Sequence, residues 1–523
     1  MSASTATATP VAPPIDPPKK KKHKLSFPTA FTILFALTII AAVATWFVPS
    51  GEYAKLSYDA ETSMLQLKTP QGEVQEYDAT QSELDNLGVK INIEELTSGN
   101  LSKPISVPDT YEALKSNPRG FGDIFASMVR GTIEAADVMV FIMVLGGMIG
   151  VVNITGAFEA GLLALTKKTK GREFALVFIV SLLMCIGGTT CGLEEEAVAF
   201  YPILVPVFLA LGYDSIVCVG AIFLASSMGT TMSTINPFSV VIASNAAGIS
   251  FMDGIQWRIF GLVVGFIVVA SYLYWYSRKV KANPSFSYTW EDHEHFAELY
   301  SVDNKGKDEN NFSIRKKIIL VLFITAFVLM VWGVMSAGWG FPKMAASFLA
   351  IAIAIMLIGG VPEKKVVDAF ISGASGMVGV SLIIGLARGI NLILNEGMIS
   401  DTLLYWSSNA VQGLPAPLFV IMLLFIFFGL GFVVPSSSGL AVLSMPILAP
   451  LADTVGLPRF VVECAYQWGQ YAMLYLAPTG LVLATLQMLD MKYSHWLRFV
   501  WPMVVFVLVF GGGLLIAQTI VYA

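Results

Sequence analysis

Three consecutive glutamates lie in the middle of a long apolar part of the sequence. Glu194, Glu195 and Glu196 follow the segment that begins at Cys185 and precede the segment that contains Pro206. A carboxylate at the centre of a membrane-spanning helix costs about 3 kcal/mol on insertion scales. Such a group can hold a cationic ligand, help to bind Na⁺, or carry a proton. Glu195 and Glu196 are therefore the first candidates for a substrate or ion contact, with Glu194 beside them.

The alternative for these glutamates is a structural one. A half-helix that begins near Leu193 or Glu194 inside the membrane has partial positive charge at its N-terminus, which stabilises an acidic side chain in the first turn. Consecutive residues of a helix point about 100° apart, so three glutamates cannot share one cap. At least one of them is then expected to face a cavity.

A second polar interruption and an arginine inside an expected membrane-spanning segment lie in the C-terminal half. Ser436, Ser437 and Ser438 offer hydroxyls and free backbone N–H groups at the start of a helix, which is a site for a carboxylate. Arg388, within IIGLARGINLIL, can clamp a carboxylate through two N–H groups, pair with one of the glutamates, or extend to the membrane interface. If the three glutamates and the three serines face each other across a cavity, one side is acidic and the other is neutral and binds anions. This combination favours a basic amino acid as ligand.

Two further segments contain residues that break a helix at membrane depth. SSMGTTMSTINPF begins at Ser226, and QWGQYAMLYLAPTG begins at Gln467. Unwound backbone there requires a covering of protein or a watery cavity, although a proline kink stabilised by neighbouring helices is the alternative. Glu463, one turn before Gln467, is expected on the same face, either lining the cavity or solvated at the helix entry. The residues expected to line a binding cavity are Ser233, Thr234 and Asn236 in the first break, and Gln467 and Thr479 in the second.

The composition identifies the kind of protein that must position these residues. Hydrophobic residues make up 55% of the 523 residues, charged residues only 13%, and the mean hydropathy is +0.70. A soluble protein carries about 25% charged residues. The chain is therefore predicted to be an all-α polytopic membrane protein with about ten to twelve spanning or half-spanning elements. The net charge of −5 argues against a nucleic-acid partner.

The sequence contains no pattern of an enzyme or of a metal site. The four cysteines lie in apolar segments without zinc-site spacing, and there are four histidines in the whole chain. No Walker motif is present, so transport driven by ATP is not expected. We expect no catalytic residue, no cofactor and no metal ligand.

Basic clusters set the expected topology. Lys19–Lys22 precede the first apolar run, and positive residues favour the cytoplasmic side, so the N-terminus is predicted to be cytoplasmic. If the later basic clusters are also cytoplasmic, the number of membrane crossings between them is limited. Residues 173–212 and 415–457 are then predicted to be hairpins that enter the membrane and return to the same side. The predicted organisation is a disordered tail (1–24), a first transmembrane helix (25–50), an external acidic loop or small soluble insert (51–135), repeat one (136–277), a cytoplasmic linker (278–316), a scaffold helix pair (317–365) and repeat two (366–523).

The two repeats share sequence. EEAVAFYPILVPVFLALGYD (195–214) aligns without gaps to GLAVLSMPILAPLADTVGLP (439–458), and GAFEAGLLAL (156–165) resembles GMISDTLLYW (397–406) at nearly the same offset. The first copy begins by crossing inward and the second by crossing outward. Inverted repeats, each with a re-entrant hairpin and an interrupted helix, indicate a secondary transporter with its binding site near the bilayer midplane.

These motifs resemble a known family. GLEEEAVAFYPILVPVFLALGYDS, the TINPF break and SSSGLAVLSMPILAPL are similar to the DcuC/ArcD carriers, in particular to the YfcC-like branch, and the similarity extends from about residue 25 to the end. The resemblance implies the fold of the ion-transporter superfamily, with a scaffold, a mobile transport domain with two hairpins, a homodimer and an elevator-type movement. Related carriers have Ser-Asn-Thr at both tips, whereas GLEEEA and SSSGLA stand here, which weighs against a dicarboxylate.

The predicted function is secondary active transport of small carboxylate-bearing metabolites, with amino acids, basic ones included, as the first substrate class. Na⁺ or H⁺ is the expected coupling ion, and the expected partners are the lipid bilayer and a second copy of the chain. The expected location is the bacterial inner membrane. A carrier of C4-dicarboxylates or other organic anions is the alternative substrate class. A membrane-embedded enzyme and a channel are the alternatives of a different class.

Overall fold

The computed structural model describes residues 29–98, 101, 103–158, 160–161, 164, 171–194, 196–299, 312–337, 339–478 and 480–522. The tail predicted for residues 1–24 lies outside these residues, as does the middle of the linker predicted for 278–316. Within the described ranges, eight helices are long and apolar enough to cross a membrane, and the three shorter apolar helices are Tyr201–Ala210, Ser215–Thr231 and Pro237–Ala247. The predicted all-α class of a polytopic membrane protein is confirmed.

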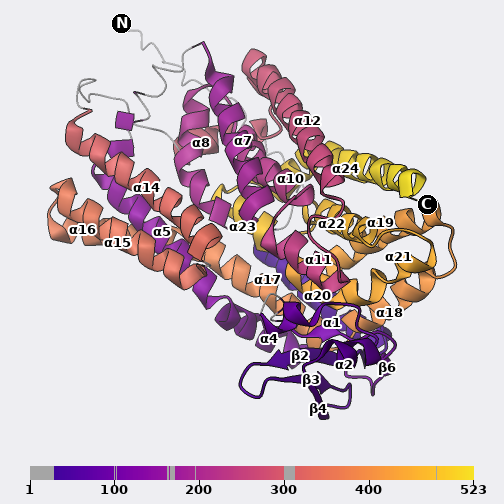
Figure 1. Cartoon of the computed structure of the whole chain (residues 1–523). Helices are drawn as coiled ribbons and strands as arrows, with labels where there is room; N and C mark the ends of the chain where they lie inside the picture. Colours follow the sequence, from indigo (N-terminus) through magenta and orange to yellow (C-terminus); the bar gives the residue numbers. More distant parts are fainter. Residues whose placement is uncertain are drawn as a thin grey trace, which may run out of the picture.

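Seven helices form one group, which we call the crossing group; in Figure 1 several of them lie along one side of the molecule. At its centre α5 packs against α16, and α4 packs against α17, while α1 and α15 flank this crossing. The helices of the crossing group are α1 (Ala30–Phe47), α4 (Phe121–Glu134), α5 (Ala136–Ile154), α14 (Ile314–Ala337), α15 (Phe341–Gly359), α16 (Glu363–Gly376) and α17 (Val378–Glu396).

The crossing group displays the inverted repeat directly. In each copy a helix of 14 residues, one linking residue and a helix of 19 residues follow one another, as α4 and α5 in the first copy and as α16 and α17 in the second. A Cβ atom on Gly131 would lie 2.7 Å from the carbonyl oxygen of Gly385, and one on Gly146 would lie 2.6 Å from that of Gly373. Residue numbers therefore rise along one copy as they fall along the other, so the copies pack antiparallel.

The structure places α4 in the crossing group, whereas its residues were predicted to belong to a loop. Residues 121–134 were expected at the end of an external loop, but they form a helix that packs against α17 as α16 packs against α5. The charges of Asp123, Arg130 and Glu134 make this stretch look like loop sequence. The repeat unit in the structure thus begins at Phe121, before the predicted boundary at residue 136.

The remaining membrane helices form a second group, which contains both hairpins and which we call the hairpin group. In its first copy, α7 (Glu173–Cys191), the 3₁₀ turn η1 (Glu196–Phe200) and α8 (Tyr201–Ala210) form the hairpin. The interrupted helix follows as α9 (Ser215–Val219), η2 (Gly220–Leu224) and α10 (Ala225–Thr231), then, after a break, η3 (Pro237–Val241) and α11 (Ile242–Ala247), and α12 (Ile255–Ala282) completes the copy.

The second copy of the hairpin group repeats this order. The helix α18 (Ser400–Val411) precedes the second hairpin. This hairpin consists of α19 (Ala416–Val433), α20 (Ser437–Leu448) and α21 (Leu451–Thr454). The second interrupted helix consists of α22 (Phe460–Leu474) and α23 (Gly480–Met488), and α24 (Tyr493–Tyr522) ends the described chain. In the part that the structure describes, both hairpins and both interrupted helices are therefore present.

A small β-domain occupies the range predicted as an external loop. We call residues 51–120 the insert. Four antiparallel strands in the order β4-β3-β2-β5 and a two-stranded pair β1-β6 pack with two short helices at the end of the molecule near α1, α4 and α18 (Figure 1). Its elements are β1 (Gly51–Glu52), β2 (Lys55–Asp59), β3 (Met64–Lys68), β4 (Val74–Asp78), α2 (Gln81–Asn86), α3 (Ile93–Thr97), β5 (Ile105–Ser106) and β6 (Glu112–Ala113).

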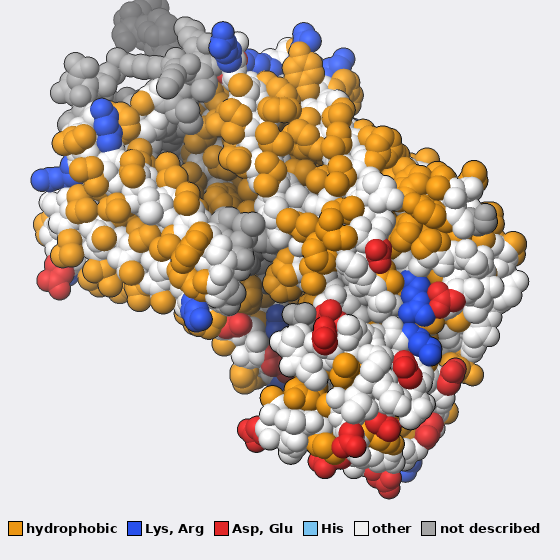
Figure 2. All heavy atoms as spheres, viewed as in Figure 1, with side chains coloured by type: hydrophobic (Ala, Val, Ile, Leu, Met, Phe, Trp, Pro, Cys, Tyr) orange, Lys and Arg blue, Asp and Glu red, His pale blue; other side chains and the backbone are white. Residues whose placement is uncertain are grey.

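The surface separates charges by sign. Hydrophobic side chains cover the two helix groups in Figure 2, acidic side chains gather on the insert, and basic side chains gather at the opposite end. After α12, the short turns η4 (Pro284–Phe286) and η5 (Trp290–Asp292) and the helix α13 (His293–Leu299) fold against this opposite end, where Lys492 pairs with Asp292 at 2.6 Å.

Candidate functional site

A cavity of about 820 Å³ lies where the two hairpin tips approach the crossing group. Its walls come from α1, α15 and α17 on one side and from both hairpin tips and the second interrupted helix on the other. Of the twelve residues predicted to bind substrate or ion, six line this cavity: Glu194, Asn236, Arg388, Ser436, Ser437 and Ser438.

The first tip places one glutamate of the three in the cavity wall. The helix α7 ends at Cys191, Gly192 adopts a left-handed conformation with φ of 66°, and Glu194 follows. A Cβ atom on Gly192 would lie 2.8 Å from Asn236 Nδ2, so the close approach of tip and break requires glycine here. Glu195 lies outside the described residues, and of Glu196 only the backbone is described.

The second half of this hairpin starts later than the sequence suggested. A helix beginning near Leu193 or Glu194 was expected, whereas the structure has a 3₁₀ turn from Glu196 and an α-helix only from Tyr201. Pro202 lies in the first turn of this α-helix, where a missing N–H costs nothing. Glu194 therefore precedes the helical residues, and its carbonyl accepts a hydrogen bond from Ala197 N.

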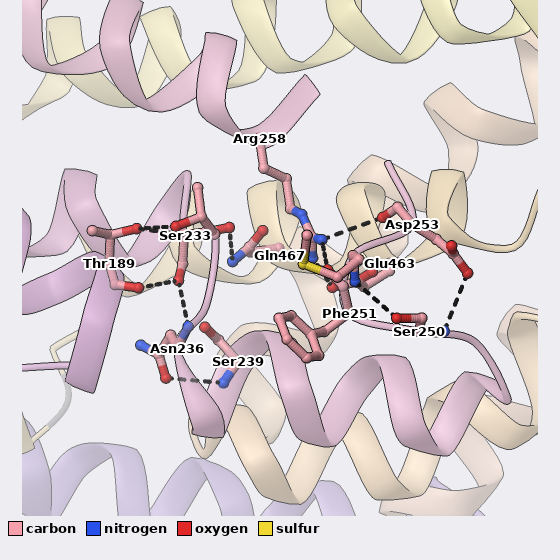
Figure 3. Close-up of polar contacts among 12 residues, drawn as sticks. Thr189, Ser233, Asn236, Ser239, Ser250, Phe251, Asp253, Arg258, Glu463 and Gln467 are labelled. Atoms are coloured by element: carbon pink, nitrogen blue, oxygen red, sulfur yellow. Dashed lines mark hydrogen bonds and ion pairs between the residues drawn. The ribbon is translucent and has the colours of Figure 1, made fainter. Parts of the chain in front are cut away.

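The first break is tied to the first hairpin by hydrogen bonds (Figure 3). Ser233 Oγ donates to the carbonyl oxygen of Thr189 at 3.0 Å, and Thr234 N donates to Thr189 Oγ1 at 3.0 Å. Asn236 Nδ2 donates to Gly188 O at 3.1 Å, while its Oδ1 accepts from Phe238 N at 2.8 Å. Ser233 and Thr234 thus hold the tip and break together and are not part of the cavity wall, whereas Asn236 contributes to both.

Gln467 links the two interrupted helices instead of lining the cavity. It is fully buried, and its Nε2 donates to Thr230 O at 3.3 Å and to Ser233 O at 3.4 Å. Among the described residues, its Oε1 has no hydrogen-bond partner. Thr479, predicted beside it, lies outside the described residues. The amide of Gln467 therefore joins the second copy of the hairpin group to the unwound backbone of the first.

The second tip presents serine side chains at the start of α20. Ser436 Oγ accepts a hydrogen bond from Gly439 N at 3.2 Å, which is an N-cap. Tyr466 donates its hydroxyl to Ser437 O at 2.7 Å and so fixes the tip to α22. Ser437 itself also lines the cavity.

Two cations and two carboxylates face this cavity. Arg388 extends from α17 into the wall, and Lys103, which belongs to the insert, reaches the second tip, where its Nζ donates to Ser438 Oγ at 2.7 Å. Removal from water and, second, the neighbouring guanidinium of Arg388 lower the pKa of Lys103. Glu134 and Glu194 also belong to the lining.

Sequence reasoning missed Lys103 and Glu134. Lys103 lies in a polar, acidic segment far along the chain from either tip, and no local pattern distinguishes it from the other lysines of the insert. Glu134 ends the helix that was interpreted as loop. A signal for Glu134 could have come from extending the repeat alignment backwards, which pairs its segment with the one before Met377.

A buried ion pair lies apart from the cavity (Figure 3). Arg258 Nη1 is 2.5 Å from Glu463 Oε1, and both side chains are fully buried. The other guanidinium nitrogen, Nη2, donates to Phe251 O and, at 3.2 Å, to Asp253 O. The expectation that Glu463 either lines the cavity or is solvated is therefore wrong. Its partner is 205 residues away in sequence, which no helical spacing could reveal.

Comparison with known proteins identifies a transporter family. A family model described as DcuC, C4-dicarboxylate anaerobic carrier, matches residues 27–520. An "Uncharacterized protein" of Haemophilus influenzae is 59% identical over 504 residues, covering 96% of this chain and 99% of that protein. The "Putative basic amino acid antiporter YfcC" of Escherichia coli K12 is 29% identical over 499 residues, covering 92% of this chain and 94% of that protein.

Two solved transporter structures are also similar. The YdaH transporter of Alcanivorax borkumensis aligns with a TM-score of 0.35 and 12% identity, over 94% of this chain and 98% of that one. MtrF of Neisseria gonorrhoeae, whose structure is described as illuminating a class of antimetabolite efflux pumps, aligns with a TM-score of 0.36 and 16% identity, over 94% and 95% of the two chains.

Proposed function

Because the chain belongs to the DcuC family of C4-dicarboxylate anaerobic carriers, we propose that it is an ion-coupled secondary transporter of amino acids, basic ones included. Membership of this family and the similarity to YfcC place the chain among membrane transporters, not among membrane-embedded enzymes.

One observation carries the choice of substrate. The cavity contains Glu194 at the first tip, and Arg388, Lys103 and the serine hydroxyls at or near the second. A carboxylate finds two cations and hydroxyl donors, which are the groups that bind it in proteins. An ammonium or guanidinium group finds Glu194 and Glu134. The cavity therefore complements a molecule with charges of both signs, as an amino acid has.

The second candidate is a C4-dicarboxylate, and a specific observation favours it too. Two cations, Lys103 and Arg388, line one cavity and could hold two carboxylates. The description of the family model points the same way, while the name of YfcC favours a basic amino acid. The glutamate at the first tip weighs against a doubly negative substrate, because a like charge in a partly dry cavity is unfavourable.

The proposed movement is an elevator-type alternation of access, in a homodimer. Both tips belong to the hairpin group, and Arg388 belongs to the crossing group. A sliding of the hairpin group along the crossing group would carry a bound molecule from one side of the membrane to the other. Inverted repeats supply two such states of similar energy, because exchanging the conformations of the copies converts one state into the other.

The proposed coupling ion is Na⁺ or H⁺, bound near the first break. Unwound backbone carbonyls at a broken helix coordinate Na⁺ in transporters of this kind. The carbonyls of Thr230 and Ser233 lie at such a break beside the buried amide of Gln467. Glu194, at the tip of the first hairpin, is the group that could carry a proton instead.

The proposed location is the bacterial inner membrane, with the N-terminus and the basic end of the molecule in the cytoplasm. The separation of basic and acidic side chains in Figure 2 supports this orientation, because positive residues accumulate on the cytoplasmic side. The insert would then face the periplasm.

Counterflow into proteoliposomes tests this function. Vesicles loaded with unlabelled L-arginine should accumulate labelled L-arginine transiently, with saturation, and vesicles loaded with succinate should do so less or not at all. Imposed Na⁺ and pH gradients then identify the coupling ion. Saturable exchange of succinate without exchange of arginine would replace the amino acid by a dicarboxylate, and linear, non-saturating flux would contradict a carrier.

A further inference from the structure

We propose that Lys103, on the insert, is a substrate-binding residue that completes a carboxylate subsite with Arg388 and Ser438. This inference rests on the proposed transport of carboxylate-bearing molecules. It adds a residue from outside both repeats to the binding site, and it makes the insert part of the machinery that selects the substrate.

Described residues before and after Lys103 are packed into the insert. Leu101 is 3% exposed and its N–H donates to Glu95 O, while Ile105 is fully buried in β5. The strand β5 pairs with β2 and packs against α20, the helix that begins at the second tip. Lys103 therefore projects toward the tip from a folded support, so its ammonium group is delivered to a defined place.

The insert is anchored to the hairpin group at two places. On the side of α18, Lys55 Nζ lies 2.8 Å from Asp401 Oδ2, and Tyr53 N donates to the same oxygen at 3.0 Å. On the side of the interrupted helices, Asn245 Nδ2 donates to Glu95 Oε2 at 2.5 Å. Because the insert is anchored at both of these places, the fold itself holds Lys103 at the cavity.

The electrostatics around Lys103 favour an anion. Its Nζ donates to the neutral hydroxyl of Ser438 at 2.7 Å, and the cationic Arg388 is close enough to affect its ionisation. In the described part of the chain, neither cation forms an ion pair with a carboxylate. Two neighbouring like charges repel, and a carboxylate between them converts that repulsion into two attractions.

The ligand group is therefore a carboxylate of the transported molecule. An ammonium group has three donors, and Ser438 uses one of them. The remaining donors of Lys103 and the fork of Arg388 can bind the two oxygens of one carboxylate together. A substrate whose carboxylate is replaced by a neutral ester should gain nothing from Lys103.

Binding to the purified full-length protein tests this assignment, with L-arginine, L-arginine methyl ester and succinate as probes. Lys103→Met should weaken binding of L-arginine, or of succinate if that is the ligand, by tenfold or more, because a contact between charged groups is lost. Its affinity for the methyl ester should stay that of the unmodified protein. Lys115→Met, an exposed lysine of the same insert outside the cavity wall, is the matched control and should change neither.

A second variant separates charge from shape. Lys103→Cys should bind poorly, should recover when the thiol receives a cationic aminoethylthio group, and should not recover with an anionic sulfonatoethylthio group. Unchanged carboxylate affinity in Lys103→Met, or equal losses for the acid and its ester, would overturn the subsite and leave the transporter assignment intact. If the unmodified protein binds none of the probes, the proposed function fails, and the subsite fails with it.

Discussion

Gly146 and Gly373 lie so close that a Cβ atom on Gly146 would come within 2.6 Å of the Gly373 carbonyl oxygen. The two glycines belong to α5 and α16, helices from different copies of the inverted repeat. Small residues permit such an approach of membrane helices, and backbone contact replaces the hydrophobic effect as the source of their association. The crossing of the two copies is thus a close contact of backbones.

The first prediction is that Gly146→Leu destabilises the protein. Overpacking a well-packed interior typically costs about 1–3 kcal/mol, and the atom to be displaced here is backbone, so a value at or above that range is expected. The melting temperature in detergent measures the effect. Gly376→Ala, at the end of α16 where a Cβ would meet no atom within 4 Å, is the control. Equal melting temperatures for the two variants would contradict the close crossing.

The second prediction concerns the buried pair of Arg258 and Glu463. Glu463→Gln leaves a buried guanidinium without its counter-charge, which should cost about 3–5 kcal/mol. Replacing both residues by methionine should cost less than the sum of the single losses, because no charge is left unpaired. Asp453→Asn, which removes one partner of an exposed pair with Arg459, should cost about 0–1 kcal/mol. Thermal unfolding of these three variants and of the single variants Arg258→Met and Glu463→Met decides, and additive losses would show that the two residues do not interact.

The third prediction is the orientation in the membrane. In a background without native cysteines, Lys279→Cys should react with a membrane-impermeant thiol reagent only from the cytoplasmic side, and Glu73→Cys only from the periplasmic side. Both positions are exposed; Glu73 lies between β3 and β4 of the insert, and Lys279 lies in the last turn of α12. Labelling of the two positions from the same side would contradict the proposed topology.

Local sequence patterns predicted the features that depend on the chemistry of neighbouring residues. Polar residues within apolar stretches led to both tips, because few arrangements at membrane depth tolerate them, and six of these residues line one cavity. Contacts made by distant segments left no local trace. Lys103 reaches Ser438 across 335 positions, and Arg258 reaches Glu463 across 205. The helix from Phe121 was missed because charged residues that face a cavity or pair with a neighbour look like loop residues.

The fourth prediction separates the roles of the glutamates. Glu194→Gln keeps shape and hydrogen-bonding capacity but removes the charge, so substrate or ion affinity should fall tenfold or more while the stability changes by about 1 kcal/mol at most. If the residue carries a proton, the variant should still exchange substrate but lose accumulation driven by a pH gradient. Glu195→Gln and Glu196→Gln are compared in the same assays, with the exposed Glu76→Gln as control.

Wild-type affinity and wild-type accumulation in all three single variants would contradict a binding role. The glutamates would then serve only to stabilise the first tip, as acidic groups near a helix N-terminus can. A fall in melting temperature without a change in affinity would support that structural role.

The central claim is that the cavity between the two tips holds the transported molecule, and counterflow by Ser437→Leu tests it most directly. The hydrogen bond that fixes this tip is accepted by the backbone carbonyl of residue 437, so the substitution keeps it and fills the cavity with a larger side chain. Thr325→Leu, an exposed position on α14 outside the cavity wall, is the control. We predict that Ser437→Leu retains its melting temperature and loses counterflow, while Thr325→Leu retains both; normal counterflow in Ser437→Leu would contradict the claim.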